Sequence, residues 1–132
     1  MISLDEFKRI LSEATDEIPP GFFDDLNGGI RLLPEWKMHP EAVHGDLYIL
    51  GEYHYDSVMG RNIAIYYGSF MRTYGNLDEN LLRERIVHTL KHEFRNHLES
   101  MGGTKELEIE DRDQIEKYRE KNRPDAPRDA KG

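Results

Sequence analysis

The chain has 132 residues, of which 37% are hydrophobic and 33% are charged, and its formal net charge is -8. This length and composition predict one globular domain with a modest core. The negative charge argues against a nucleic-acid partner, because phosphate contacts need clustered Lys and Arg. The sequence contains no cysteine, so any metal site has to be built from His and carboxylate side chains.

The sequence also argues against a membrane partner. No stretch approaches the roughly 18 consecutive apolar residues of a membrane span. The first residues lack the basic and apolar regions of a secretory signal. We therefore expect a cytoplasmic location.

The first predicted element is an N-terminal helix. Ser3-Leu4-Asp5-Glu6 is a capping-box pattern, and Pro19-Pro20 ends the helical pattern that follows. The apolar residues between these two signals recur at helical spacing: Leu4, Phe7, Ile10, Leu11 and Ala14. We expect this apolar face to pack on a sheet.

Three segments that follow are rich in β-branched, aromatic and aliphatic residues and are bounded by Gly, Pro and Asp. They predict strands at residues 30–33, 47–55 and 62–68. Residues 57–61 separate the last two and form a predicted hairpin loop. Residues 34–45 form a predicted long loop, which either lines a substrate groove or covers the edge of the sheet.

A long helix is predicted next, from a cap at Asn76-Leu77-Asp78-Glu79 to about Met101, where Gly102-Gly103 stops it. His97 falls within the apolar face of this helix, and His92 lies nearly opposite. That face is formed by Leu82, Ile86, Val87, Leu90, Phe94, Leu98 and Met101.

The remainder of the sequence is predicted to hold a short helix and a tail. Residues 113–120 have the pattern of a short C-terminal helix. Residues 121–132 are rich in charge, proline and alanine, which predicts a disordered polar tail. We therefore expect the folded domain to cover residues 1–120.

The long helix contains a near match to a zinc-protease motif, His92-Glu93-Phe94-Arg95-Asn96-His97. The usual motif is His-Glu-x-x-His, in which two imidazoles one turn apart bind zinc and the glutamate activates the metal-bound water. Here the position four residues after His92 is Asn96, and the next imidazole follows one residue later at His97.

Helical geometry shows how much this shift matters. At about 100° per residue, position 96 lies roughly 40° around the helix from His92, whereas position 97 lies roughly 140° away. A zinc site that uses both His92 and His97 therefore requires a π-bulge, which inserts one residue into the helical repeat. Alternatively, His97 is a packed core histidine. His88, one turn before His92, allows a different imidazole pair.

Five segments carry a resemblance to a known family. They are Ile18-Pro19-Pro20-Gly21-Phe22-Phe23, Leu26-Asn27-Gly28-Gly29-Ile30, Leu47-Tyr48-Ile49-Leu50-Gly51-Glu52-Tyr53, Ile65-Tyr66-Tyr67-Gly68-Ser69-Phe70, and His92-Glu93-Phe94-Arg95 followed by His97-Leu98-Glu99-Ser100. In order and spacing they resemble the small bacterial zincin-like metallopeptidase family, in its Gram-positive, single-domain form. The family helix resembles His-Glu-Phe-Arg-His-His, so Asn96 stands where its second histidine is expected. The shifted spacing is similar to the His-Glu-x-x-x-His motif of dipeptidyl peptidase III.

The resemblance implies a minimal zincin-like α+β domain, with an N-terminal helix, a sheet of about three strands, a long active-site helix and a short C-terminal helix. It also implies one zinc ion, bound by His92, His97 and a downstream carboxylate, with Glu93 as the general base. Asp111 is the preferred third ligand, because Glu110-Asp111 match the end of an acidic run in the family. Glu110 and Glu108 are the alternatives.

Two functions follow from these observations. The first is a zinc-dependent metallopeptidase that hydrolyses peptide bonds with a metal-activated water, from which Glu93 takes the proton. Asn96 weakens the expected zinc affinity, because a neutral amide oxygen is a poor zinc donor. The second is a catalytically inactive zincin-like domain that binds a peptide or protein partner in the same groove. The sequence predicts no oligomeric state.

Overall fold

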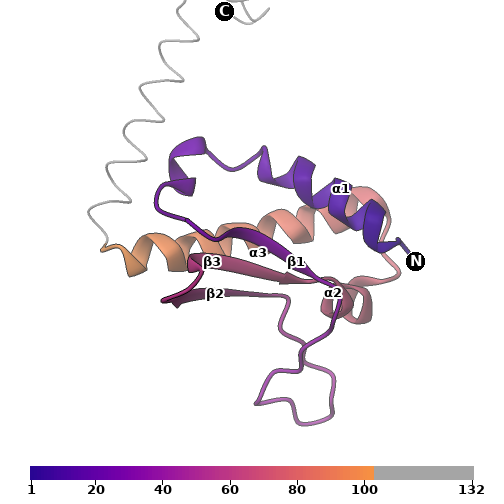
Figure 1. Ribbon diagram of the computed structural model, residues 1–132. Helices are drawn as coiled ribbons and strands as arrows, with labels where there is room; N and C mark the ends of the chain where they lie inside the picture. Colours follow the sequence, from indigo (N-terminus) through magenta and orange to yellow (C-terminus); the bar gives the residue numbers. More distant parts are fainter. Residues whose placement is uncertain (103–132) are drawn as a thin grey trace, which may run out of the picture.

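The computed structural model describes residues 1–102, which form three α-helices and one three-stranded sheet (Figure 1). The predicted α+β fold class is therefore confirmed. The helices are α1 (Leu4–Thr15), α2 (Tyr67–Tyr74) and α3 (Glu79–Ser100); the strands are β1 (Gly29–Leu33), β2 (Gly51–Asp56) and β3 (Gly60–Tyr66); a 3-10 turn, η1, spans Pro20–Phe23. The predicted helix at 113–120, the boundary at residue 120 and Asp111 lie outside the described residues.

Helix α1 begins where the capping pattern predicts. The side chain of Ser3 accepts a hydrogen bond from the main-chain N of Glu6 at 3.2 Å. Phe7 and Ile10 are fully buried, and they project from the face that the apolar spacing predicts. Full burial of a side chain of this size contributes roughly 1.5–3 kcal/mol, which anchors α1 to the rest of the domain.

The sheet has the strand order β1-β3-β2, so β1 and β2 are its two edges. β3 runs parallel to β1 and antiparallel to β2. As the central strand, β3 holds the fully buried Ile63, Ala64 and Ile65. A tight turn joins β2 to β3, in which the side chain of Asp56 accepts hydrogen bonds from the main-chain N of Val58 and of Met59. The predicted hairpin is thus present.

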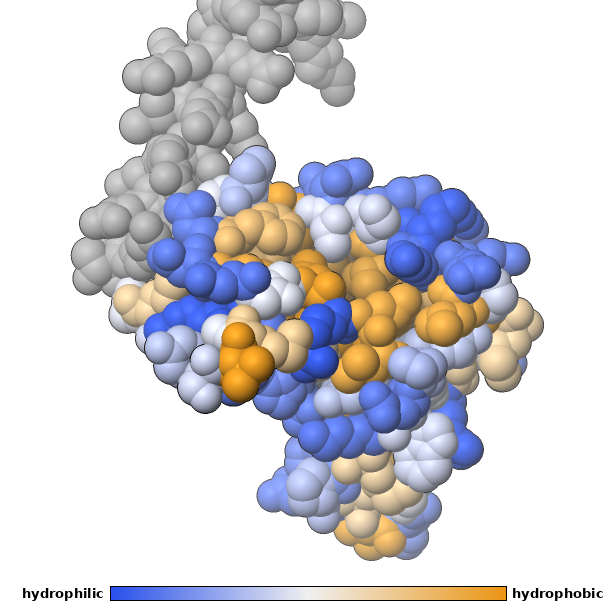
Figure 2. All heavy atoms as spheres, viewed as in Figure 1, coloured by the Kyte–Doolittle hydropathy of each residue, from blue (hydrophilic) through white to orange (hydrophobic). Residues whose placement is uncertain are grey.

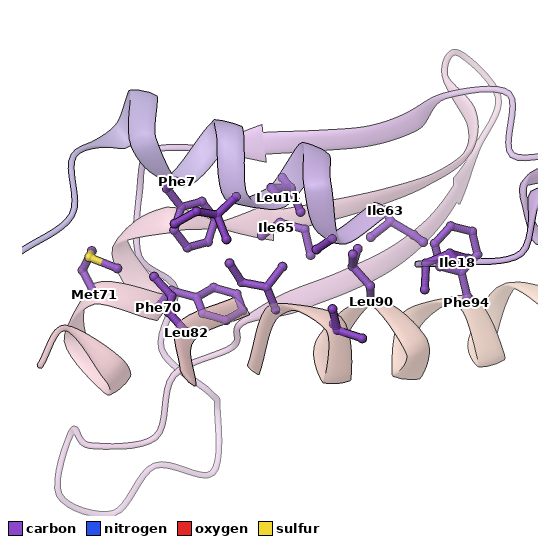
Figure 3. Close-up of a cluster of buried hydrophobic side chains, with 14 of the residues drawn as sticks. Phe7, Leu11, Ile18, Ile63, Ile65, Phe70, Met71, Leu82, Leu90 and Phe94 are labelled. Atoms are coloured by element: carbon purple, nitrogen blue, oxygen red, sulfur yellow. The ribbon is translucent and has the colours of Figure 1, made fainter. Parts of the chain in front are cut away.

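The hydrophobic core lies between the sheet and two of the helices. Phe7 and Leu11 of α1, Ile63 and Ile65 of β3, and Leu90 and Phe94 of α3 belong to one buried cluster (Figure 3). Helices α1 and α3 therefore cover the same face of the sheet. This arrangement fixes α3 alongside the β2 edge and α1 alongside the β1 edge.

Strand β2 is shorter than predicted, because it starts at Gly51 and not at residue 47. Residues 47–49 pair with 37–39 instead: His39 N donates to Leu47 O, and Ile49 N donates to Lys37 O, each at 2.8 Å. The reason is that β3 ends at Tyr66, so it offers no partner to the residues before Leu50. The predicted long loop is present and extends to residue 50.

The predicted strand at 62–68 also ends early, because helix α2 starts at Tyr67. The pattern of apolar residues did not predict α2. Gly68 explains its position: a Cβ on this residue would lie 2.7 Å from the carbonyl carbon of Glu35 and 2.7 Å from the amide nitrogen of Trp36. In addition, Ser69 Oγ accepts a hydrogen bond from Lys37 N at 2.9 Å. These contacts hold the loop of residues 34–50 against α2.

Helix α3 matches its prediction closely. The side chain of Asp78 caps it by accepting a hydrogen bond from Leu81 N at 2.9 Å. The helix then continues as a regular α-helix to Ser100, and Gly102, with φ at 84°, follows its end. Within residues 1–102, no helix is long and apolar enough to cross a membrane.

A shallow groove runs between α1 and the edge strand β1. It is lined by the apolar residues Leu4, Leu11, Ile30 and Leu32, together with Asp5, Lys8, Ser12 and Thr15. Figure 2 shows apolar side chains gathered between α1 and β1, with hydrophilic residues around them. This groove and the candidate site described below lie at opposite edges of the sheet.

Candidate functional site

One side of helix α3 faces strand β2. Three residues on this side are spaced four apart and therefore lie one above another along the helix: Thr89, Glu93 and His97. Thr89 lies against β2, because a Cβ on Gly51 would be 3.0 Å from Thr89 Cγ2. At the other end, the hydroxyl of Tyr53 lies 2.9 Å from His97 Nδ1. Glu93 therefore faces β2 between the levels of Gly51 and Tyr53.

An open groove of about 590 Å³ lies between β2 and α3. Three elements line this groove. Helix α3 contributes His88, Thr89, His92, Glu93 and Asn96, and β2 contributes Gly51, Glu52 and Tyr53. The loop of residues 34–50 contributes His39, Tyr48, Ile49 and Leu50. The two motif residues His92 and Glu93 therefore open onto the same groove. His92 is exposed, whereas Glu93 is buried.

The carboxyl group of Glu93 has one protein hydrogen bond among the described residues. Asn96 Nδ2 donates to Glu93 Oε1 at 3.1 Å. Glu93 is only 5% exposed, and this burial raises the pKa of its carboxyl group above the usual value. Asn96, the residue that departs from the zinc motif, thus orients the carboxylate next to it.

His97 lies in the core with both ring nitrogens occupied. A carbonyl oxygen can only accept, so His97 Nε2 carries a proton and donates to the main-chain O of Asp24 at 2.8 Å. In the neutral ring Nδ1 is then an acceptor, and the Tyr53 hydroxyl donates to it at 2.9 Å. His97 is fully buried, and burial lowers its pKa, so the neutral form is favoured.

Arg61 extends this series of hydrogen bonds to the surface. Its Nη1 donates to the Tyr53 hydroxyl at 3.0 Å and also contacts Ser100 Oγ at the end of α3. The ring centroids of Tyr53 and His97 are 5.3 Å apart, so the two rings also form an aromatic contact. Together these residues join β2, β3 and α3 at one end of the groove.

The structure does not bring His92 and His97 to one metal ion. Helix α3 is α-helical throughout, so it lacks the π-bulge that such a pair requires. His92 faces the open groove, whereas His97 points to Tyr53 and Asp24 in the core. The structure therefore agrees with the alternative interpretation, in which His97 is a packed core histidine.

The expected third zinc ligand belongs to the part of the chain after residue 102. Asp111 and its alternatives Glu108 and Glu110 lie outside the described residues. Within residues 1–102, no group of three or more His, Asp or Glu side chains is arranged to bind a metal ion. His88 and His92 share the groove, and they are the imidazoles that remain accessible on this face of α3.

Sequence reasoning missed the contribution of β2 and its neighbours to the site. The sequence pattern predicts a strand that includes Gly51, Glu52 and Tyr53, but nothing in that pattern indicates which helix they face. The only usable signal was the resemblance of the segment around them to a known family. Asp24 and Arg61, which complete the environment of His97, gave no signal.

Comparison with known proteins finds a similar solved structure. No protein-family model matches this sequence, and no curated protein matches it. A solved structure of a conserved hypothetical protein from Thermus thermophilus is similar, with 30% sequence identity and a TM-score of 0.63. The match covers 77% of this chain and 99% of that one. Because it spans almost all of the Thermus thermophilus protein at this identity, the chain belongs to the same family as that protein.

Proposed function

We propose that this protein is a zincin-like domain that binds an extended peptide, or an extended segment of a protein partner, in the groove between β2 and α3 without hydrolysing it. The observation that carries this proposal is the environment of His97. Both of its ring nitrogens are hydrogen-bonded in the core. His97 therefore does not supply the groove with the second imidazole of the zinc motif.

The edge of β2 supports binding by strand addition. In the described part of the protein, β2 pairs with β3 alone. In an antiparallel pair, every second residue hydrogen-bonds to the partner strand, and the residues between them direct their main-chain groups away from it. Tyr66 N donates to Leu50 O at 3.0 Å, so Leu50 is one of the residues that bond to β3. Gly51, Tyr53 and Tyr55 consequently direct their main-chain N–H and C=O groups toward the open side. A peptide strand at about 4.8 Å from β2 would pair with these groups and lie over α3.

The described residues do not fit a zinc ion well. An amide side chain is a poor zinc donor, and that of Asn96 is already hydrogen-bonded to Glu93. His97 would have to leave two hydrogen bonds in the core to reach the groove. These observations favour binding over hydrolysis.

Zinc-dependent hydrolysis is the second candidate function. It is favoured by one observation, namely that His92 and Glu93 both line the groove. It would need a second imidazole, for which His88 is the accessible residue, and a carboxylate from beyond residue 102, such as Asp111. Zinc bound in this way would activate a water molecule and polarise the peptide carbonyl. The role left to Glu93 would be to accept a proton.

The proposal places the protein in the cytoplasm, with peptides or proteins as its partners. Neither a nucleic acid nor a membrane is among the proposed partners. The net charge of -8 disfavours nucleic acid, and no stretch of the sequence is long and apolar enough for a membrane span.

One experiment separates the two candidate functions. A fluorescent mixture of N-acetylated, C-amidated peptides rich in β-forming residues is incubated with the protein, in EDTA or in zinc. Anisotropy reports binding, and mass spectrometry reports cleavage. We expect saturable binding in EDTA and intact peptides in zinc. Cleavage that requires zinc would support the second candidate instead, and a failure to bind in either buffer would refute the proposal.

A further inference from the structure

One carboxylate in the groove has no cationic partner within residues 1–102. Glu93 is 5% exposed and lines the groove. In that range its hydrogen-bond partner is the amide of Asn96, which contacts Oε1 and leaves Oε2 without a partner. No Lys or Arg of the same range forms an ion pair with it. A buried carboxylate without a counter-charge is costly, so this group favours a ligand that supplies one.

The neighbouring carboxylate of Glu52 provides a comparison. Glu52 also lines the groove, but its Oε1 lies 2.8 Å from Lys37 Nζ and accepts a hydrogen bond from the Tyr66 hydroxyl at 2.6 Å. Its charge is therefore matched within the protein. Glu93 differs in this respect, because no Lys or Arg of residues 1–102 pairs with it. Burial raises the pKa of its carboxyl group, and the hydrogen bond from Asn96 and the nearby His92 offset this only in part.

The position of Glu93 determines which part of a ligand it would meet. Side chains of a strand alternate between its two faces, so every second side chain of a peptide added to β2 points toward α3. Glu93 lies on α3 between the levels of Gly51 and Tyr53. We infer that the groove recognises a basic side chain, Lys or Arg, of the bound peptide through the carboxylate of Glu93. This inference rests on the proposed peptide-binding function.

Two further features agree with a basic ligand. Lys and Arg carry their charge on long apolar stems, which suits a carboxylate that lies at the base of a groove. The net charge of -8 attracts positively charged peptides at long range. By contrast, half of the residues that line the groove between α1 and β1 are apolar, and its two charged residues, Asp5 and Lys8, have opposite signs.

A double-mutant cycle tests this inference. The probes are two N-acetylated, C-amidated peptide mixtures whose flanking positions are drawn from Thr, Val, Ile and Tyr. Their central position is fixed as lysine in one and as norleucine, which has a similar stem without charge, in the other. Acetylation removes the terminal ammonium group, so only the side chain supplies a cation. Kd is measured in EDTA for wild type, Glu93→Gln and Glu99→Gln. Glu99 is an exposed residue of the same helix outside the groove and serves as the charge control.

We expect wild type and Glu99→Gln to bind the lysine mixture about tenfold more tightly than the norleucine mixture, as a charge-assisted hydrogen bond predicts. Glu93→Gln should lose this preference while its Kd for the norleucine mixture stays the same. Equal binding of both mixtures by wild type, or a lysine preference that persists in Glu93→Gln, would overturn the inference while leaving peptide binding intact. If neither mixture binds wild type, the proposed function itself fails.

Discussion

His97 illustrates how the partners of a single side chain change a functional interpretation. Its sequence position one residue after Asn96 makes it a candidate zinc ligand. Its two hydrogen bonds, to Tyr53 and to the main chain of Asp24, instead make it part of the core. Those partners lie 44 and 73 residues away in the sequence. No local pattern could reveal them, whereas the apolar stripe that includes His97 was visible from helical spacing.

Replacing His97 with alanine should destabilise the fold. The change leaves a cavity and removes the acceptor of the Tyr53 hydroxyl and a donor to the Asp24 carbonyl, so we expect a loss of about 2–5 kcal/mol in the free energy of unfolding. Urea denaturation measures this loss. His92→Ala is the matched control, because His92 is exposed, and its effect should stay within about 0.5 kcal/mol. A stable His97→Ala protein that loses bound zinc would instead show that His97 is a ligand.

Glu93 should make stability depend on pH. Its pKa in the folded state is raised above the usual 4.5, so between these values the folded protein binds more protons than the unfolded protein. Stability therefore falls as pH rises from about 4.5 through the folded pKa. Glu93→Gln removes this effect and should raise Tm at pH 7, with the difference shrinking toward pH 4. Thermal unfolding of both proteins across this pH range measures the difference. A lower Tm for Glu93→Gln at pH 7 would contradict this account.

At the scale of elements, the periodic patterns predicted α1, α3 and the buried centre of the sheet. They failed where a boundary depends on contacts distant in sequence. β3 ends and α2 begins at a site where Gly68 lies against the main chain of Glu35 and Trp36. Single-sequence patterns contain no information on this packing. The same contact fixes the loop of residues 34–50, which closes one end of the groove.

Gly68→Ala should therefore disturb both the fold and the groove. A Cβ at this position would lie 2.7 Å from main-chain atoms, which cannot move as freely as a side chain. We expect a loss of about 1–3 kcal/mol in stability, and weaker peptide binding because the loop is displaced. Thr73→Ala, an exposed change on α2, is the control for stability and binding. If Gly68→Ala unfolds at the same urea concentration as that control, the contact does not define the boundary.

At the scale of the whole molecule, the groove depends on how α3 and the β2 edge are placed together. The helix by itself predicted that His92 and Glu93 lie close together, but not that they face an edge strand. A histidine at position 96 would place a second imidazole near His92 on the face of α3 that lines the groove.

Asn96→His should accordingly increase zinc affinity. On the regular helix α3, position 96 lies roughly 40° around from His92, so two imidazoles would share one face. We expect the Kd for zinc, measured by titration against a competing chelator, to tighten at least about tenfold relative to wild type. Asn96→Gln provides no imidazole and should not change the affinity. Tight, near-stoichiometric zinc binding by wild type would show that the site is already complete.

The most direct test of the central claim is to map where a peptide binds, by following the main-chain amide signals of the ¹⁵N-labelled protein by NMR in EDTA. Saturable shifts at Gly51, Tyr53 and Tyr55, together with the Asn96 side-chain amide, are the predicted result. Slower hydrogen exchange at those three main-chain amides should accompany them, because strand addition gives each a new partner. Shifts confined to the α1 and β1 groove, or shifts that appear only after zinc is added, would contradict a metal-independent peptide site between β2 and α3.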